Sequence, residues 1–323
     1  MDKINIWRLK WVWLEIEDSR GQAKEAVNYL PFNDMDFQNR TEEVIDESAI
    51  WQILDSSDWY ITRSWADGSL DGFVRNTTFW YILRNVLSDY WVSGPVSDLY
   101  DHIFKLEDDN TSQSISITEF DPKGSKIYSL WMIDSLDIEV NQNEYVTFSA
   151  DVTSKKWETS TVEKTDLNFL SWDFAYRGKD VKVSMDPDWE WYDLLELNSF
   201  SLNIDKWVGD PFFAIGSEDP TEISNQLTTI TGSLEKRRKN ITEFEAKKWD
   251  IVKLKIELID PNTDWDQHLT IILNRVMIIS YEKDMGLDDI EVENIDFKIL
   301  TDDWVDPIVV TLKNPKESYD PVE

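Results

Sequence analysis

Few side chains in this sequence belong to the types that most often carry out chemistry. The two histidines, His102 and His268, fit no metal-ligand spacing and no pairing of a nucleophile with its base. Cysteine is absent, which excludes thiolate catalysis, thiolate metal sites and disulfides. Asp188 and Glu190 resemble the carboxylate pair of a glycosidase, but such a pair carries little weight among 64 acidic residues. We therefore predict that the chain is not an enzyme.

The segment 260–266 reads Asp-Pro-Asn-Thr-Asp-Trp-Asp and resembles the start of a calcium-binding loop. Such a loop needs glycine at its sixth position and a bidentate glutamate at its twelfth, where this chain has Trp265 and Ile271. A plain turn is the better interpretation. A glycine-rich phosphate loop is also missing, and the chain has only 10 Gly. We expect neither a metal nor a cofactor.

The formal net charge of −32 is the strongest compositional signal. A protein that grips nucleic-acid phosphates needs Lys and Arg to displace counterions, so tight DNA binding is excluded. Two interpretations of the acidity stay open. It keeps the protein soluble, which charge alone favours, or it forms a surface along which DNA passes without sticking.

The chain is long enough for two domains and apolar enough for real cores. It has 323 residues, of which 41% are hydrophobic and 17 are Trp. Each aromatic side chain can bury about 150–250 Å², so we expect large cores or subunit contacts. The N-terminus lacks a signal-peptide core, and no stretch approaches the length of a membrane span. With no cysteine, these features favour an intracellular or virion protein.

Alternation of apolar and polar residues predicts half-buried β-strands over most of the chain. In the segment 135–140, three aliphatic residues share one face, and Asp137 and Glu139 share the other. In the segment 145–152, the polar face includes Asp151. The exposed face of this strand pair is therefore predicted to be acidic or neutral.

A similar strand pair is predicted near the C-terminus. Asp296 points outward between apolar neighbours. Just before it, Glu291 and Glu293 are also expected to point outward, so the alternation must slip by one residue. We expect a β-bulge near Asn294.

A short motif and the elements behind it occur twice. Gly-Ser-Leu stands at 68–70 and again at 232–234, and each copy precedes a helix candidate, at 78–89 and at 242–249. Strands follow in both copies. We interpret this order as an internal duplication of one β-rich unit.

The duplication predicts two tandem domains, at 1–158 and 159–323. The first copy is longer, which indicates an insertion near 91–121. Within the insertion, the segment 95–105 is a candidate for a third helix. The polar run 153–165 is the expected boundary between the domains.

The order of these segments resembles that of the tail tube (major tail) proteins of long-tailed bacteriophages and related viruses. The resemblance covers most of the chain from about Asp67 onward, whereas the Trp-rich start and the segment 91–121 depart from the pattern. Four sets of segments carry the resemblance. They are the strand 68–72 before an apolar helix, the segment 208–220 before the segment 231–234, the segment 269–281 followed by the segment 290–300, and the strand pair 135–140 and 145–155.

The resemblance implies a mainly-β fold of β-sandwich or barrel units, each with a short α-helix, whose strands join an inner barrel between subunits. Such proteins form rings that stack into the hollow tube of the virion tail, after assembly in the host cytoplasm. The implied partners are other copies of the chain, the tail tip, tape-measure and terminator proteins, and viral DNA in transit without specific binding; no membrane is involved. The duplication favours three chains per pseudo-hexameric ring over six.

In such a tube, the acidic strand faces would line the lumen and a basic run could contact the next ring. A solvated hairpin tip explains the basic run equally well. The lumen candidates are Asp137, Glu139, Asp151, Glu291, Glu293 and Asp296. The candidates for contacts between rings are Lys236, Arg237, Arg238 and Lys239.

Two alternatives stay open at this stage. Trp-rich clusters such as 186–192 suit a carbohydrate-binding β-sandwich, in which indole rings stack on sugars. A tail terminator or connector ring would share the fold but form a single closed layer.

Overall fold

The computed structural model describes most of the chain. The helix expected at 242–249, the calcium-like segment 261–266, and the basic residues Arg238 and Lys239 lie outside the described residues. The residues that the structure describes are 10–26, 28–48, 56, 58–107, 112–121, 124–160, 173–186, 193–237, 251–260, 267–284, 291–302 and 304–319.

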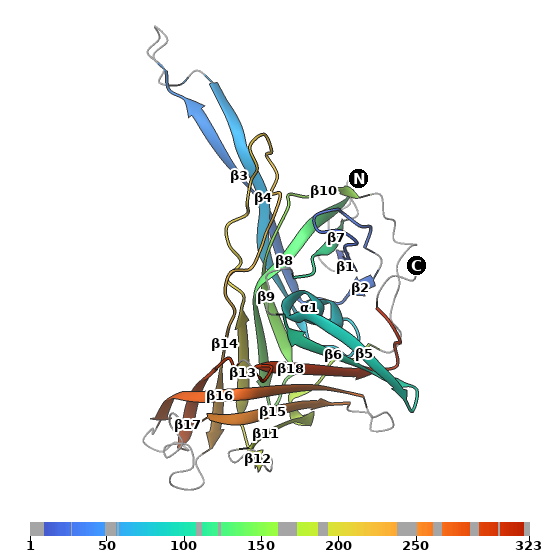
Figure 1. Ribbon diagram of the computed structural model, residues 1–323, viewed down its shortest axis with the longest axis vertical. Coiled ribbons are helices and arrows are strands. Elements are labelled where there is room, and N and C mark those ends of the chain that lie inside the picture. The colour runs from blue at the N-terminus through green and yellow to red at the C-terminus, as the bar shows by residue number, and fades with distance from the viewer. Residues whose placement is uncertain are drawn as a thin grey trace, which may run out of the picture.

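An antiparallel sheet, here called the main sheet, dominates the molecule, and several of its strands run along the longest axis (Figure 1). Hydrogen bonds link eight described strands in one continuous order. That order is β3 (Asp34–Asp46), β4 (Asp58–Phe73), β9 (Thr147–Ser154), β8 (Gly124–Asn141), β13 (Ser199–Asp205), β14 (Thr229–Arg237), β17 (Val292–Ile299) and β16 (His268–Asp284). The mainly-β fold predicted from the sequence is confirmed.

The same pairing pattern occurs twice along the main sheet. The hairpin β3–β4 is followed by β9 and then β8, and the hairpin β13–β14 is followed by β17 and then β16. The register of β8 against β9 shifts just before Ser135, which lies opposite Asp151. The register of β16 against β17 shifts just before Ser280, which lies opposite Asp296. Each four-strand set thus carries a bulge at the same place.

The two Gly-Ser-Leu motifs occupy matching places in these sets. Gly68 on β4 lies opposite Val152, and Gly232 on β14 lies opposite Phe297. A Cβ atom on either glycine would overlap a backbone carbonyl of the partner strand in its hairpin. Glycine therefore permits the close approach of the two strands at both places.

A second set of paired strands shares β16 with the main sheet. Its strands run across the direction of the long strands of the main sheet (Figure 1). The N-terminal part of β16 pairs with β15 on one side and β18 on the other. Further pairings extend this set at both ends. Its strands are β12 (Asp193–Leu195), β11 (Val181–Asp186), β15 (Ile251–Ile259), β18 (Ile308–Asn314), β6 (Leu99–Leu106) and β5 (Ser88–Val96).

The helix predicted at 95–105 is wrong, because this segment forms the end of β5 and most of β6. Val96 pairs with Leu99, which leaves Ser97 and Asp98 as a two-residue turn. Both turn residues have positive φ, at 55° and 62°, which is the backbone geometry of the tight hairpins that suit twisted strands. The segment 91–121 therefore contributes strands to the sheets.

The helix expected at 78–89 is confirmed as α1 (Phe79–Leu87). Eight of its nine residues are buried. It packs against β5, β6, β8 and β1, so its apolar surface is covered on several sides. The short helix η3 (Gly178–Asp180) lies near β15 and β8.

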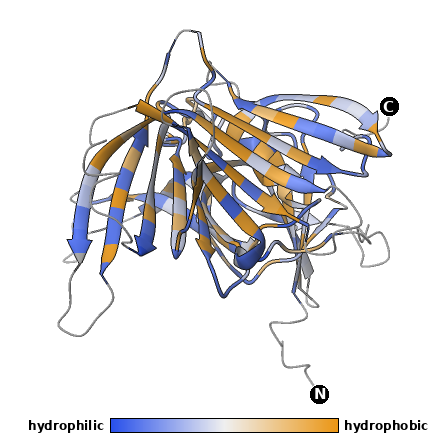
Figure 2. Cartoon of the chain, turned by 90° about the horizontal axis from the view of Figure 1, so that it is seen from below, coloured by the Kyte–Doolittle hydropathy of each residue, from blue (hydrophilic) through white to orange (hydrophobic). Residues whose placement is uncertain are grey.

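A third, smaller group of strands covers the other side of α1. The first half of β8 pairs with β7 and β10, and β7 continues through β1 to β2. Trp13 on β1 and Trp131 on β8 are buried in this region. The alternation of apolar and polar residues is visible along the strands (Figure 2). The new strands are β1 (Trp11–Ile16), β2 (Asn28–Leu30), β7 (Ile115–Asp121) and β10 (Glu158–Ser160).

Candidate functional site

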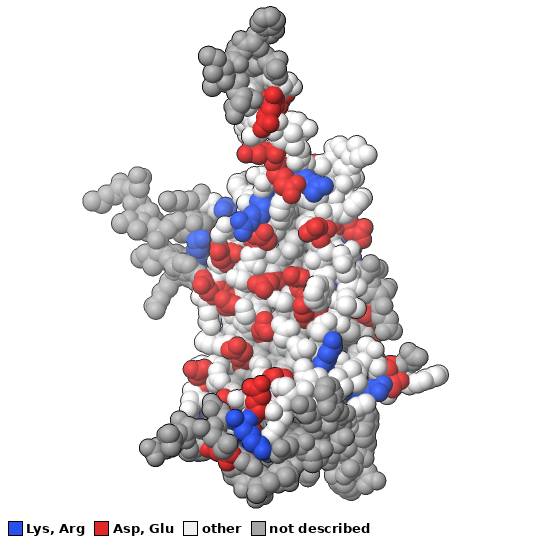
Figure 3. Space-filling view, turned by 90° about the vertical axis from the view of Figure 1, so that its left-hand side faces the viewer, with Lys and Arg blue, Asp and Glu red and all other residues white. Residues whose placement is uncertain are grey.

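One side of the main sheet is open to solvent and strongly acidic. On β8, the aliphatic residues of 136–140 are buried and the residues between them are not, as their alternation predicts. The space-filling view shows acidic side chains spread over this side, with few basic ones (Figure 3). We call this side the open face and define it by Ser135, Asp137, Glu139, Ser149, Asp151, Asn203, Asp205 and Asp296.

Hydroxyl and amide groups hold the carboxylates of the open face in place. Ser135 Oγ donates a hydrogen bond of 3.0 Å to Asp151, and Asn203 Nδ2 donates one of 2.8 Å to Asp137. In the second four-strand set, Ser280 Oγ donates one of 2.6 Å to Asp296. The donors fix the direction of these carboxylates.

Neutral residues separate the acids from strand to strand between β4 and β17, whereas Asp34 lies directly opposite Asp71 in the hairpin β3–β4. Asp71 and Asp137 lie in one row across the strands, with Ser149 between them. In the next row, two serines on β13 and β14 separate Glu139 from Asp296. Carboxylates directly opposite one another would destabilise the sheet. The spacing makes a surface that is acidic throughout and still compatible with a stable sheet.

The acids gather most closely around a hollow of about 390 Å³ between β3, β4, β8 and β9. It is lined by Asp36, Asp67, Asp134 and Asp151, among others. Burial raises the pKa of Asp134, and the nearby carboxylates of Asp205 and Asp151 raise it further. Within the described chain, no group of acidic residues and histidines has the arrangement of a metal site.

Four of the predicted lumen residues lie together on the open face. Glu139, Asp151 and Asp296 are exposed and Asp137 is half-buried. Glu291 precedes β17 and is half-buried.

Glu293 is a correction, because it lies on the opposite, buried face. The alternation of β17 runs unbroken from Val292 to its end, and the register shift lies in the partner strand β16 and not near Asn294. Glu293 is only 2% exposed. It accepts a hydrogen bond of 2.8 Å from Tyr281 and lies 3.6 Å from Lys236 Nζ, which makes its burial tolerable.

The basic run predicted to contact another ring is divided. The Lys236 side chain is mostly buried in its ion pair with Glu293, so it is not a free surface group. Arg237 is exposed at the end of β14.

Several acids of this site were not predicted from the sequence. Asp205 continues the alternation of the segment 199–204, which would have placed it on the polar face. Asp36 stands between Met35 and Phe37 in a similar alternation. That Asp36, Asp67 and Asp134 meet depends on the pairing of β3, β4, β9 and β8, which no single segment indicates.

A family model described as phage tail tube protein matches residues 13–297. The chain belongs to the phage tail tube protein family. The matched residues extend from β1 to β17 and include the strands of the open face. No curated protein was found that matches the sequence. As a phage tail tube protein, the chain is a structural component of a virion tail.

A separate observation concerns membranes. Within the described ranges, the structure contains no helix with the length and apolar character needed to cross a bilayer.

Proposed function

We propose that this tail tube protein forms stacked rings in which the open faces of all subunits line a channel for viral DNA. The observation that carries the proposal is the continuous acidic face on a sheet whose two edge strands have no described strand on their outer side. Those edges are β3 and the C-terminal part of β16. Exposed edges are templates for pairing with another chain. Pairing of β3 with β16 of the next copy would repeat head to tail and close a ring.

The repeated strand pattern supports two tandem units and three chains per ring. Each four-strand set has its own bulge, Ser–Asp pair and close-approach glycine. If each set supplies one sixth of the inner barrel, three chains complete it, whereas a one-unit chain would need six. The proposed units are 1–158 and 159–323.

The acidity of the open face fits a channel through which DNA slides. Carboxylates repel phosphates over roughly 8 Å at physiological salt, the screening distance of charges in that medium. Repulsion over this range keeps DNA off the wall without closing the centre of a wider channel. The proposed lumen residues are Asp137, Glu139, Asp151, Glu291 and Asp296.

Family membership favours this role over a carbohydrate-binding β-sandwich and over a terminator ring, because the matching family is described by the tube itself. In this setting the partners are other copies of the chain, the tail tip, tape-measure and terminator proteins, and DNA in transit. Assembly takes place in the host cytoplasm.

The test is charge reversal on the open face. A variant with Asp137→Lys, Glu139→Lys, Asp151→Lys and Asp296→Lys should still assemble, since these side chains are outside the core. Its tubes should retain DNA in co-sedimentation, and virions that carry it should eject DNA more slowly by an order of magnitude or more.

The matched control replaces the same residues with Asn or Gln, which removes the charge without creating phosphate-binding groups. Its DNA retention should lie between those of the wild type and the lysine variant. Tubes of the lysine variant that release DNA at the wild-type rate would contradict an acidic lumen.

A further inference from the structure

The hairpin β3–β4 extends well beyond the body of the molecule (Figure 1). It carries exposed apolar side chains toward its outer end. Every residue of β3 from Gln38 to Asp46 is exposed. Ile45 is 50% exposed, and Trp59 and Tyr60 are 59% and 63% exposed. Exposed strands with large apolar residues favour association with another surface.

The tip is also acidic. Its described residues include Glu42, Glu43, Asp46, Glu47 and Asp58, whereas the nearest base is Arg63, which pairs with Glu42 at 3.5 Å. A partner surface for this tip should combine apolar contacts with positive charge.

A pocket with these properties lies at the other end of the longest axis, beside β11, β12 and the ends of β13 and β14. Its volume is about 700 Å³, within the range of about 300–1,000 Å³ for pockets that enclose a ligand. Its lining includes the buried apolar residues Val183 and Phe200 and the exposed residue Leu194.

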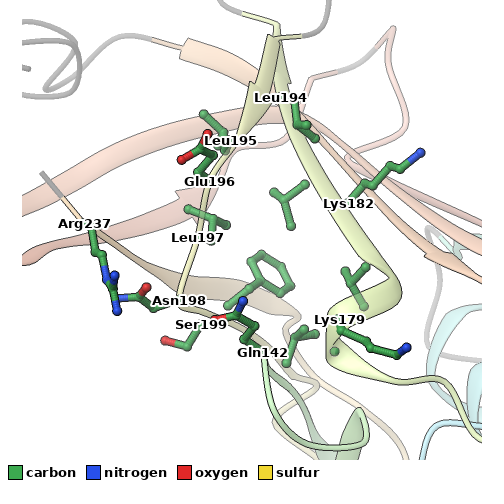
Figure 4. A pocket seen from close by; sticks show the side chains of 15 residues that line it. Gln142, Lys179, Lys182, Leu194, Leu195, Glu196, Leu197, Asn198, Ser199 and Arg237 are labelled. Atoms are coloured by element: carbon green, nitrogen blue, oxygen red, sulfur yellow. The ribbon is translucent and has the colours of Figure 1, made fainter. Parts of the chain in front are cut away.

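Basic side chains surround this pocket. Lys179 and Lys182 lie on one side and Arg237 on the opposite side (Figure 4). All three are exposed. Glu196 is the one acidic residue among the lining residues of the described chain. The pocket therefore offers an apolar floor and a mainly positive rim.

We propose that the hairpin tip of one copy docks into this pocket of a second copy stacked end to end with it. The inference rests on the proposed stacking of rings and assigns the residues that make the contact. The tip and the pocket match in charge and in apolar character. They lie at opposite ends of the molecule, so one contact repeated between successive copies builds an open-ended tube.

Two aromatic side chains in the described part of the hairpin are the anchors of the contact. Trp59 and Tyr60 present large rigid side chains of the kind that dominate binding energy at interfaces. The positive charges of the two lysines and Arg237 attract the acidic strands of the hairpin. They repel the equally basic pocket end of another copy, so two pocket ends do not dock together.

Disulfide trapping tests the contact, because the natural chain has no cysteine and only introduced thiols can react. A double variant with Glu43→Cys on the hairpin and Leu194→Cys at the pocket should, after mild oxidation of assembled tubes, give a ladder of covalent oligomers on non-reducing gels. Reductant should collapse the ladder to monomer. The matched control carries Asp151→Cys on the open face with Leu194→Cys, and it should give at least tenfold less covalent product.

Electron microscopy of the same samples separates the two proposals. Tubes that form normally but give no more ladder than the control would overturn the docking contact and leave the tube function standing. A wild-type protein that forms neither rings nor tubes would overturn the stacking proposal and the docking contact with it.

Discussion

At the scale of single residues, His102 shows how the fold holds a titratable group away from water. Its side chain is fully buried. Tyr90 donates a hydrogen bond of 2.8 Å to Nδ1, and Nε2 donates one of 2.8 Å to the carbonyl of Lys316. Burial lowers the pKa of His102 from 6.5 to about 4. The neutral ring thus ties β6 to the segment after β18.

This pKa predicts a loss of stability as the pH falls below 6.5. In that range the unfolded chain binds a proton at His102 and the folded chain does not, so the free energy of unfolding decreases. The decrease from this group should be roughly 1–2 kcal/mol between pH 6.5 and 5. Urea denaturation of the wild type and of His102→Gln at several pH values measures it. The variant should show the shallower pH dependence, and equal slopes would contradict the assignment.

At the scale of elements, the hairpins β3–β4 and β13–β14 depend on one close approach each. Gly68 faces the backbone of Asp36, and Gly232 faces the backbone of Ser201. A shift of the Asp36 backbone would disturb the ladder between β3 and β4, and a shift of the Ser201 backbone would disturb the pairing of β13 with both β14 and β8. The glycines are thus part of the sheet geometry.

Gly68→Ala and Gly232→Ala should therefore each destabilise the protein. The added methyl group meets a backbone carbonyl that cannot rotate away, and overpacking of this kind costs about 1–3 kcal/mol. Thermal unfolding measures the effect. Ser69→Ala, at the position next to Gly68, is the control and should change stability by less than about 0.5 kcal/mol. If Gly68→Ala and Gly232→Ala were as stable as this control, the prediction would be contradicted. The two strands of each hairpin could then move apart without a loss of folding free energy.

At the scale of the whole molecule, the proposed ring has a defined composition. Eight strands per chain in two similar sets predict three chains per ring. The charge at the pocket rim provides a way to isolate such rings, since Lys179→Glu with Lys182→Glu should weaken stacking without touching the edges β3 and β16.

Native mass spectrometry of this variant should find rings of about 114 kDa, three times the chain mass of 38.1 kDa. The control Lys298→Glu changes an exposed lysine of β17, away from the pocket, and should leave tubes intact. Rings with six chains, of twice the predicted mass, would contradict the two-unit proposal. Tubes of normal length from the pocket variant would contradict the role of the rim charges.

Features that depend on near neighbours along the chain could be predicted from the amino-acid pattern alone. Alternation placed Asp137, Glu139 and Asp151 on one face, and an all-round apolar segment gave the buried helix α1. The helix predicted at 95–105 was wrong, because strand pairing prevailed there over a weak local preference for helix. The order of short segments also sufficed to indicate the family.

Which distant residues meet became clear only from the folded chain. Glu293 lies on the buried face because the one-residue shift occurs in β16 and not in β17, where a shift near Asn294 would have exchanged the two faces. The hollow that joins Asp36, Asp134 and Asp151 forms only after four strands have paired. The alternation within one strand says which residues share a face, whereas the choice of partner strand and the place of a bulge follow from contacts between segments far apart in the chain.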